Sequence, residues 1–282
     1  SSAIPTTLVS KFAKQKVTVS LSADGGDEIF AGYSQYWRFP RKMNQLSRWS
    51  YLQNKLSSNL LKGVSRLIPD NLERPKHIIE SLSDNFKANT DELVIKNYES
   101  SRKTPDFHSK KLFNHNPKRH YGFGSNNSKL KSIEQLMIND YQNYLQNDIL
   151  TKVDRATMTH SLEGREPMLD HRLAEYVARL PVDYKYKSGI TKKILKDIVH
   201  EYVPESMMQR PKTGFSIPIL KWLKEDLSYY LDDYLSKEKL DQVEIINTDY
   251  ALYLVNRFKA NKLHYSPIIW KLLMFMMWWE RW

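Results

Sequence analysis

Residues 17–33 constrain the fold of this chain more than any other segment. They open with the β-branched run Val-Thr-Val-Ser-Leu, which is typical of a short buried strand. A turn follows, and then the start of a helix. Gly25, Gly26 and Gly32, three of the nine glycines, lie close together here. Residues without a Cβ atom let a backbone turn tightly and approach a ligand closely. The segment therefore predicts a strand, a ligand-binding turn and a helix in direct succession.

The turn also carries three carboxylates, Asp24, Asp27 and Glu28. Their negative charges repel one another unless a cation lies among them, typically Mg²⁺ carried by a nucleotide or pyrophosphate. Turns favour glycine and aspartate in any case, so a solvated turn in which Asp27 caps the helix explains the same residues. The turn by itself leaves both interpretations open.

The composition limits the class of protein. With 282 residues, of which 41% are hydrophobic and 12% aromatic, the chain is expected to fold into one or two domains. Its net charge of 43 − 32 = +11 suits an anionic partner, but the basic residues form no block and no nucleic-acid-binding signature. We therefore expect no nucleic-acid partner. The absence of cysteine excludes disulfides, thiolate catalysis and cysteine-ligated zinc.

Neither a signal peptide nor a membrane span is indicated. The first residues lack a basic stretch followed by an apolar one. The longest apolar run, residues 267–279, is interrupted by Lys271 and is shorter than the ~20 residues that a span needs. We expect a cytoplasmic protein with no membrane partner. A membrane-surface helix anchored by tryptophans is a minor alternative.

The sequence pattern divides the chain into three parts. Residues 1–40 contain a helix over 5–15 and the strand over 17–21, whose parallel partner would lie upstream. Because one parallel strand cannot stand alone, we expect the polypeptide to start inside a domain. Residues 41–130 are expected to form an insertion of helices and loops, and residues 131–282 a helical subdomain. In the last part, apolar residues at helical spacing predict helices over 132–145, 148–161, 170–180, 191–203, 218–235, 248–260 and 267–281.

Residues 147–158 carry an unusual aspartate. Asp154 lies near Val153 and Ala156, and we expect it among residues that face the core. A carboxylate in such a place is paired or functional, because burying an unpaired charge is costly. A salt bridge to Arg155 or Arg165 explains Asp154 equally well.

Two further segments place a glycine beside a cation. Gly164 suits the end of a helix, and the adjacent Arg165 can bind a carboxylate or phosphate or form a structural ion pair. Lys212 lies between two helices, in a loop that also holds a proline and a glycine. A lysine there can neutralise charge on a departing phosphate, although an ordinary solvated lysine fits the same pattern.

Together these segments resemble the synthetase domain of glutamine-dependent asparagine synthetases. Residues 22–33, Ser-Ala-Asp-Gly-Gly-Asp-Glu-Ile-Phe-Ala-Gly-Tyr, are similar to the family's S-G-D-G-G-D-E-L-F-G-G-Y. The runs at 152–158, 162–170 and 210–215 also match the family, in the family's order. Ala23 and Ala31 replace family glycines, and each adds a methyl group where the resemblance leads us to expect a backbone with positive φ.

The resemblance implies a fold and a reaction. The fold is mainly α: the C-terminal helical part of an α/β adenine-nucleotide α-hydrolase-like (PP-loop ATP pyrophosphatase) domain, with one or two short parallel strands. In the family, ATP adenylates the side-chain carboxylate of aspartate and pyrophosphate leaves. Ammonia then attacks the acyl-adenylate. This ammonia comes from glutamine through a separate domain with a catalytic cysteine. A homodimer follows by family analogy.

The resemblance also implies roles for individual residues. Asp27 would be a Mg²⁺ ligand. Asp24 would handle a proton or position the acyl acceptor, and Asp154 would contact the substrate amine or the incoming ammonia. Lys212 would hold the pyrophosphate and stabilise charge that develops during adenylation. The residues implied to bind ATP with Mg²⁺ are Ser22, Gly25, Gly26, Asp27 and Lys212, and those implied to bind the acid substrate are Glu28, Asp154 and Arg165.

Two parts of the family pattern are not found in these residues: the S-G-G-x-D-S pyrophosphate loop and the cysteine of the glutaminase domain. We therefore expect a fragment of a larger synthetase that by itself binds ATP poorly and makes no asparagine. A related amidotransferase that amidates a sugar or another carboxylate in surface polysaccharide assembly is the alternative. A basic helical module that binds nucleic acid or membrane is a remote one, and it predicts binding that depends strongly on salt.

Overall fold

The computed structural model describes residues 2–41, 63, 67, 108, 111–115, 130–208, 214 and 217–282. Nearly all of the expected insertion over 41–130, and Lys212, lie outside the described residues. The chain forms two compact units. Unit 1 comprises residues 1–99 and 121–215, and unit 2 comprises residues 100–120 and 216–282.

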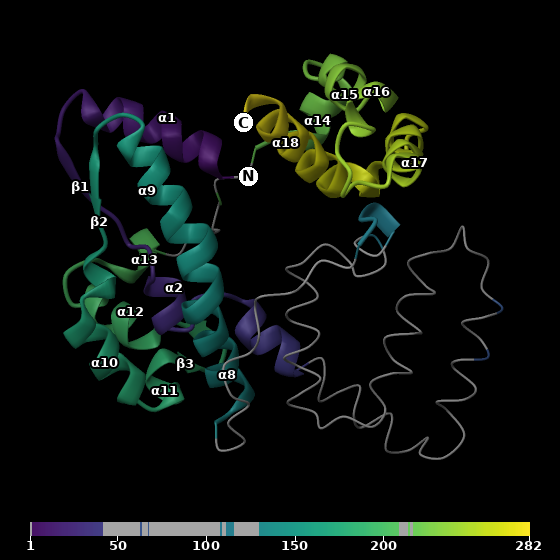
Figure 1. The fold of residues 1–282 in the computed structure, drawn as a ribbon. Helices are drawn as coiled ribbons and strands as arrows, with labels where there is room; N and C mark the ends of the chain where they lie inside the picture. Colours follow the sequence, from purple (N-terminus) through teal and green to yellow (C-terminus); the bar gives the residue numbers. More distant parts are fainter. Residues whose placement is uncertain are drawn as a thin grey trace. The chain divides into compact units, whose positions relative to one another are not determined.

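Unit 1 begins with a helix and a strand, as the sequence predicts, but the strand is not buried: two of its residues are half-buried and one is exposed. Helix α1 (Ala3–Lys14) packs along the later helix α9 (Thr151–Met158), and strand β1 (Val19–Leu21) follows α1. The strand pairs in parallel with β2 (Glu163–Arg165), with Ser20 opposite Gly164. Figure 1 shows the two strands side by side. One parallel partner of β1 thus lies far downstream in the same chain. The expected upstream partner concerns the other side of β1 and stays a prediction.

Gly164 does not end a helix, contrary to the sequence interpretation. It is the central residue of β2, and the preceding helix ends at Met158. The left-handed conformation near this helix end belongs to Ser161, with φ = 55°. The glycine was misinterpreted because β2 has only three residues. A strand this short is too short to show the alternation of apolar and polar residues by which strands are recognised in a sequence.

One long helix crosses unit 1. It consists of α8 (Ser132–Asn139), a wide-turned π-helical stretch η1 (Asp140–Leu150) and α9 (Thr151–Met158), without interruption. The sequence predicted two separate helices here. Thr151 Oγ donates a hydrogen bond to the carbonyl of Gln146, five residues back, which is the spacing of a π-turn. Leu145, Ile149 and Val153 pack into one buried cluster.

The rest of unit 1 is a series of short elements. Asp170 caps α10 by accepting a 2.9 Å hydrogen bond from the Arg172 N–H, which confirms the predicted cap. The hairpin of β3 and β4 turns through Ser188 and Gly189, both with positive φ, and the sequence interpretation had not foreseen it. The elements are α2 (Gly26–Ile29), η2 (Pro167–Leu169), α10 (His171–Arg179), α11 (Val182–Lys185), β3 (Tyr186–Lys187), β4 (Ile190–Thr191), α12 (Lys193–His200) and α13 (Glu205–Met208).

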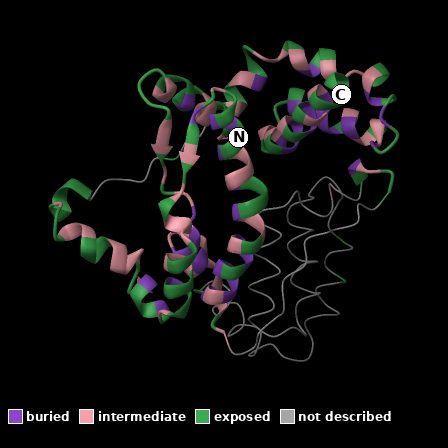
Figure 2. Ribbon diagram, turned by 60° about the vertical axis from the view of Figure 1, so that its left-hand side comes forward, coloured by how far each residue is buried: buried purple, intermediate pink, exposed green. Residues whose placement is uncertain are grey.

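Unit 2 is helical. Its last two long helices confirm the prediction, whereas the helix predicted over 218–235 is broken after Lys224 because Glu225 leaves the helical conformation. Buried residues such as Leu254, Ile269 and Leu273 form one core, and Figure 2 shows buried positions on the inner sides of these helices. The elements are α14 (Ile219–Lys224), α15 (Tyr229–Tyr234), α16 (Lys237–Leu240), α17 (Thr248–Lys259), η3 (Leu263–Tyr265) and α18 (Ser266–Arg281).

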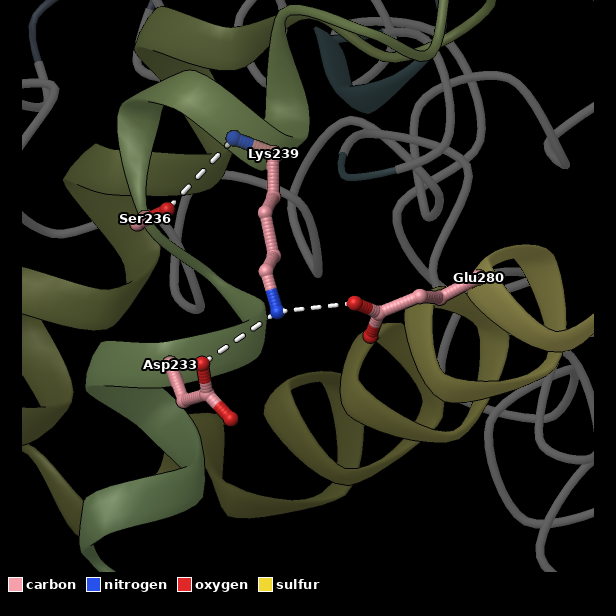
Figure 3. Close-up of polar contacts among 4 residues, drawn as sticks. All are labelled: Asp233, Ser236, Lys239 and Glu280. Carbon is pink, nitrogen blue, oxygen red and sulfur yellow. Dashed lines mark hydrogen bonds and ion pairs between the residues drawn. The ribbon is translucent and has the colours of Figure 1, made fainter.

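A lysine ties the end of α18 to its neighbours in unit 2 (Figure 3). Lys239 Nζ lies 3.0 Å from Glu280 Oε1 and 3.2 Å from Asp233 Oδ1. Its ammonium also lies 4.5 Å from the ring centre of Tyr234. The hydrogen bond to Glu280 is the main cause that raises the pKa of Lys239. Ser236 Oγ caps α16 by accepting a hydrogen bond from the Lys239 N–H.

In the part of the chain that the structure describes, no helix is long and apolar enough to cross a membrane.

Candidate active site

The carboxyl ends of β1 and β2 bring the polar residues of unit 1 together. Ser22 and Asp24 follow β1, and Glu166 follows β2 directly. The Ser22 N–H donates a 2.9 Å hydrogen bond to the Arg165 carbonyl, which extends the ladder by one step. Because the strands are parallel, these residues emerge at one edge of the sheet. That edge is where open α/β sheets bind their ligands.

Glycine is required at the turn after β1. Ser22 Oγ donates a 2.8 Å hydrogen bond to Asp24 Oδ2 and accepts one from the Asp24 N–H at 3.2 Å. Gly25 then adopts φ = 85° and directly precedes α2. A Cβ atom on Gly25 would lie 2.2 Å from Cδ2 of Leu169 in η2. The turn thus needs glycine both for its backbone conformation and for its contact with η2.

One of the two alanines that replace family glycines is in the left-handed region. Ala31 has φ = 53° and is completely buried. Ala23 is not among the described residues with positive φ. The concern about added methyl groups is confirmed for Ala31, and the backbone at Ala23 suits any residue.

Ala31→Gly is expected to leave stability nearly unchanged. Relief of the left-handed strain, about 1–2 kcal/mol, offsets the loss of a buried methyl group and the greater freedom of the unfolded chain. Ala156→Gly in α9, equally buried but helical, should cost about 1.5–2 kcal/mol. Urea denaturation of the two variants measures the difference. Equal losses would contradict the strain at Ala31.

Glu166 lies near two other carboxylates, Asp24 and Asp154. Burial raises the pKa of Glu166, and the negative charges of Asp24 and Asp154 raise it further. Asp154 stands on the exposed side of α9, so the expectation that it lies among core-facing residues is wrong. Among the described residues Asp154 forms no ion pair. Arg165 instead binds Glu163, with 2.7 Å between Nε and Oε1.

Sequence reasoning did not single out Glu166. The residue lies within the motif at 162–170, but nothing in that motif alone places it beside Asp24. The available signal was the parallel pairing: the first residue after β2 must lie near the first residues after β1. Because the sequence did not predict β2, it did not predict that Glu166 lies near Asp24.

Asp27 lies against a lysine from a distant part of the chain. Lys192 Nζ is 3.0 Å from Asp27 Oδ1, and both side chains are mostly buried. The described ranges contain no group of three or more acidic, histidine or cysteine residues arranged for a metal. Magnesium carried by a nucleotide needs only one or two carboxylates, because the phosphates supply further oxygens. Asp27 already holds a cation in the form of the Lys192 ammonium, so its carboxylate suits this role.

Glu28 lies inside the fold rather than facing a pocket. It is 1% exposed, and the Tyr33 hydroxyl donates a 2.7 Å hydrogen bond to Oε1. Burial raises the pKa of Glu28. Beside it, the Tyr36 hydroxyl donates to the buried Asp140 at 2.8 Å. The first contact holds α2 to the residues that follow it, and the second holds those residues to the π-helical stretch. A direct contact of Glu28 with substrate stays a prediction.

Glu166→Gln is expected to stabilise the protein slightly at pH 7.5. The folded state raises the pKa of Glu166, so its ionised form opposes folding above that pKa. The gain should be about 0.5 kcal/mol at most, because solvent screens a partly exposed carboxylate. It should vanish only when the pH lies well below the ordinary glutamate pKa of about 4.3, because at that pH the unfolded chain is still half ionised. Thermal unfolding at pH 7.5 and at about pH 3 tests this, with Glu163→Gln as the matched control that should bring no gain. A gain that persists at the lower pH would contradict the cause.

Comparison with known proteins identifies the family of the chain. Residues 1–280 match the family model described as asparagine synthase. The chain is 33% identical to asparagine synthetase [glutamine-hydrolyzing] 1 of Bacillus subtilis over 98% of its length and 42% of that protein. It is 27% identical to a putative asparagine synthetase [glutamine-hydrolyzing] of Mycobacterium tuberculosis over 98% of its length and 41% of that protein. Bovine asparagine synthetase [glutamine-hydrolyzing] matches at 36% identity over 32% of this chain and 16% of that protein.

The chain thus spans about two fifths of the length of the bacterial relatives that match it throughout. No solved structure matches. The family model covers nearly every residue, including the Gly-Gly-Asp turn and the strand that carries Glu166 to it. On this evidence the chain belongs to the asparagine synthase family.

Proposed function

We propose that this chain forms the acyl-acceptor side of a synthetase that uses ATP to adenylate the side-chain carboxylate of aspartate and transfers the acyl group to ammonia. The observation that carries the proposal is the placement of Asp24 and Glu166 at the carboxyl ends of β1 and β2, with Asp154 of α9 near enough to act on Glu166, beside a turn that needs glycine. Relatives named asparagine synthetases, which match the chain over 98% of its length, support the choice of reaction.

The chemistry requires a proton acceptor. In the first step the acid's carboxylate displaces pyrophosphate from ATP. In the second, ammonia forms the amide bond, AMP leaves and one proton is released. Asp24, held by Ser22, is placed to take this proton or to orient the group that does. The negative charges of Asp154 and Glu166 beside it favour an ammonium ion or the amino group of the substrate.

The nucleotide side of the reaction requires cations. Mg²⁺, when bound, would neutralise charge on the departing phosphates, and Asp27 is the carboxylate that would hold it. Lys212 lies outside the described residues, and its contact with pyrophosphate remains part of the proposal. Gly25 packs against Leu169 and so sets the shape of the turn, and a direct contact of Gly25 or Gly26 with ATP remains part of the proposal.

The exposed apolar side of α1 and β1 supports the PP-loop fold. Leu8 and Phe12 are 52% and 67% exposed, and Leu21 at the end of β1 is 72% exposed. Parallel sheets are normally covered on both faces and have more than two strands. We propose that further parallel strands of a PP-loop ATP pyrophosphatase domain extend this sheet and that their layer covers α1.

The test is the release of pyrophosphate from Mg-ATP by the protein as its gene encodes it, with ammonium as the nitrogen source. Release that requires aspartate and yields asparagine and AMP supports the proposal. Release that requires a uronic acid instead supports amidation of a sugar carboxylate. Release that no acid stimulates, or no release with any of these acids, overturns the proposed function.

A further inference from the structure

Lys192 is joined to the Gly-Gly-Asp turn by two separate contacts. Its ammonium lies 3.0 Å from Asp27 Oδ1. Its backbone N–H donates a 3.1 Å hydrogen bond to the carbonyl of Phe30, just after α2. The side chain and the backbone of Lys192 thus both bind residues 27–30, and the two contacts together fix the position of the Lys192 ammonium.

The hairpin of β3 and β4 delivers Lys192 in an unusual conformation. Ser188 and Gly189 turn the chain with positive φ, and Lys192 itself has φ = 52° before α12 begins. A non-glycine residue in this region costs free energy, so the surrounding contacts must hold it there. Those contacts are the ones that Lys192 makes with Phe30 and Asp27.

Gly32 makes room for the ion pair. A Cβ atom on Gly32 would lie 1.9 Å from Asp27 Oδ1 and 2.4 Å from Lys192 Cε. Any side chain at position 32 would push the carboxylate and the lysine stem out of place. The absence of a side chain at Gly32 therefore lets Lys192 and Asp27 stand in contact. As a result, the Lys192 ammonium is held beside the carboxylate that is proposed to bind Mg²⁺.

We propose that Lys192 is the resident counter-ion of Asp27, and that it makes the site select a metal–nucleotide complex over the free metal ion. The inference rests on the proposed function, in which Asp27 holds Mg²⁺. A free divalent cation is repelled by the Lys192 ammonium and competes with it for Oδ1. A metal–ATP complex has a net negative charge, so the same ammonium attracts it. Lys192 is thus a positioning residue for Asp27 and a source of specificity.

Lys192→Met tests this by moving two affinities in opposite directions. Binding of free Mn²⁺, followed by water-proton relaxation, should tighten about tenfold, because a competing positive charge is lost. Binding of Mg-ATP, followed by calorimetry, should weaken about tenfold. Lys193→Met is the matched control: the adjacent Lys193 pairs with Asp197 on its own helix, and both affinities should stay unchanged. Lys192→Arg, which keeps the charge, should remain close to wild type. Circular dichroism checks that each variant is folded.

The outcomes separate this inference from the proposed function. If Lys192→Met leaves Mn²⁺ binding unchanged or weaker, or if neither it nor the wild type binds Mn²⁺, the counter-ion role is overturned. If Mg-ATP binds too weakly to measure, the Mn²⁺ result alone decides. Asp27→Asn should weaken Mn²⁺ binding. If it has no effect, Asp27 is not a metal ligand, and the proposed metal role falls together with the inference. If Asp27→Asn weakens binding and Lys192→Met does not tighten it, only the inference falls.

Discussion

Replacing Asp24 with asparagine is expected to lower the rate of amide formation by about 100-fold or more, because a positioned proton acceptor contributes this much in other enzymes. The change removes the charge and keeps the shape, so the hydrogen bonds with Ser22 can persist and the turn should stay folded. The measurement is the rate of AMP release with saturating aspartate, ammonium and Mg-ATP.

The control for this variant is Asp148→Asn. Asp148 is exposed on the π-helical stretch and lies outside the carboxylate set. Its replacement should change the rate less than twofold. A similar small effect of Asp24→Asn would remove Asp24 from the proton path, and the charges of Glu166 and Asp154 would then have to account for the chemistry.

Gly25→Ala is expected to destabilise unit 1 by about 2–4 kcal/mol. About 1–2 kcal/mol comes from forcing alanine to a positive φ, and a similar amount from the collision with Leu169. The built Cβ atom lies 2.2 Å from Cδ2 and 2.7 Å from Cγ of that leucine, so η2 or the turn must move. Denaturant unfolding measures the loss.

Gly189→Ala separates the two causes. Gly189 has φ = 89°, close to the 85° of Gly25, but no heavy atom lies within 4 Å of its built Cβ atom. It should cost about 1–2 kcal/mol, the backbone part alone. The double variant Gly25→Ala with Leu169→Ala gives a second check, because removing the leucine side chain relieves the collision. Equal losses in Gly25→Ala and Gly189→Ala would show that η2 does not restrain the turn.

Patterns within a few residues predicted the local structure well. The β-branched run before the glycines became β1, Asp170 caps its helix, and the helices predicted over 248–260 and 267–281 formed as α17 and α18. Each of these signals depends on residues that are close in the sequence. A cap depends on the first turn of its own helix, and an apolar stripe depends on residues spaced about 3.6 apart. Such interactions are local, so the residues that specify them can be read together.

Errors occurred where a distant partner decides the structure. The sequence around Gly164 looked like the end of a helix, but Gly164 is the central residue of β2. It is extended because this segment pairs with β1, and that partner lies far away in the sequence. Asp154 was a local error by contrast. It looked core-facing because it lies beside Val153 and near Ala156 in the sequence, but the buried side of α9 consists of Val153, Ala156 and Thr157 and leaves Asp154 exposed.

The sequence by itself determined the Gly-Gly-Asp turn, its carboxylates and the family to which they point. These depend on backbone freedom at Gly25 and on charges placed within a few residues of it. The tertiary structure alone decided that Glu166 and Lys192 join that turn, one through the pairing of two short parallel strands and one through a hairpin that holds a lysine at positive φ. Contacts between segments so far apart in the chain form only when the core packs, and no local spacing records them.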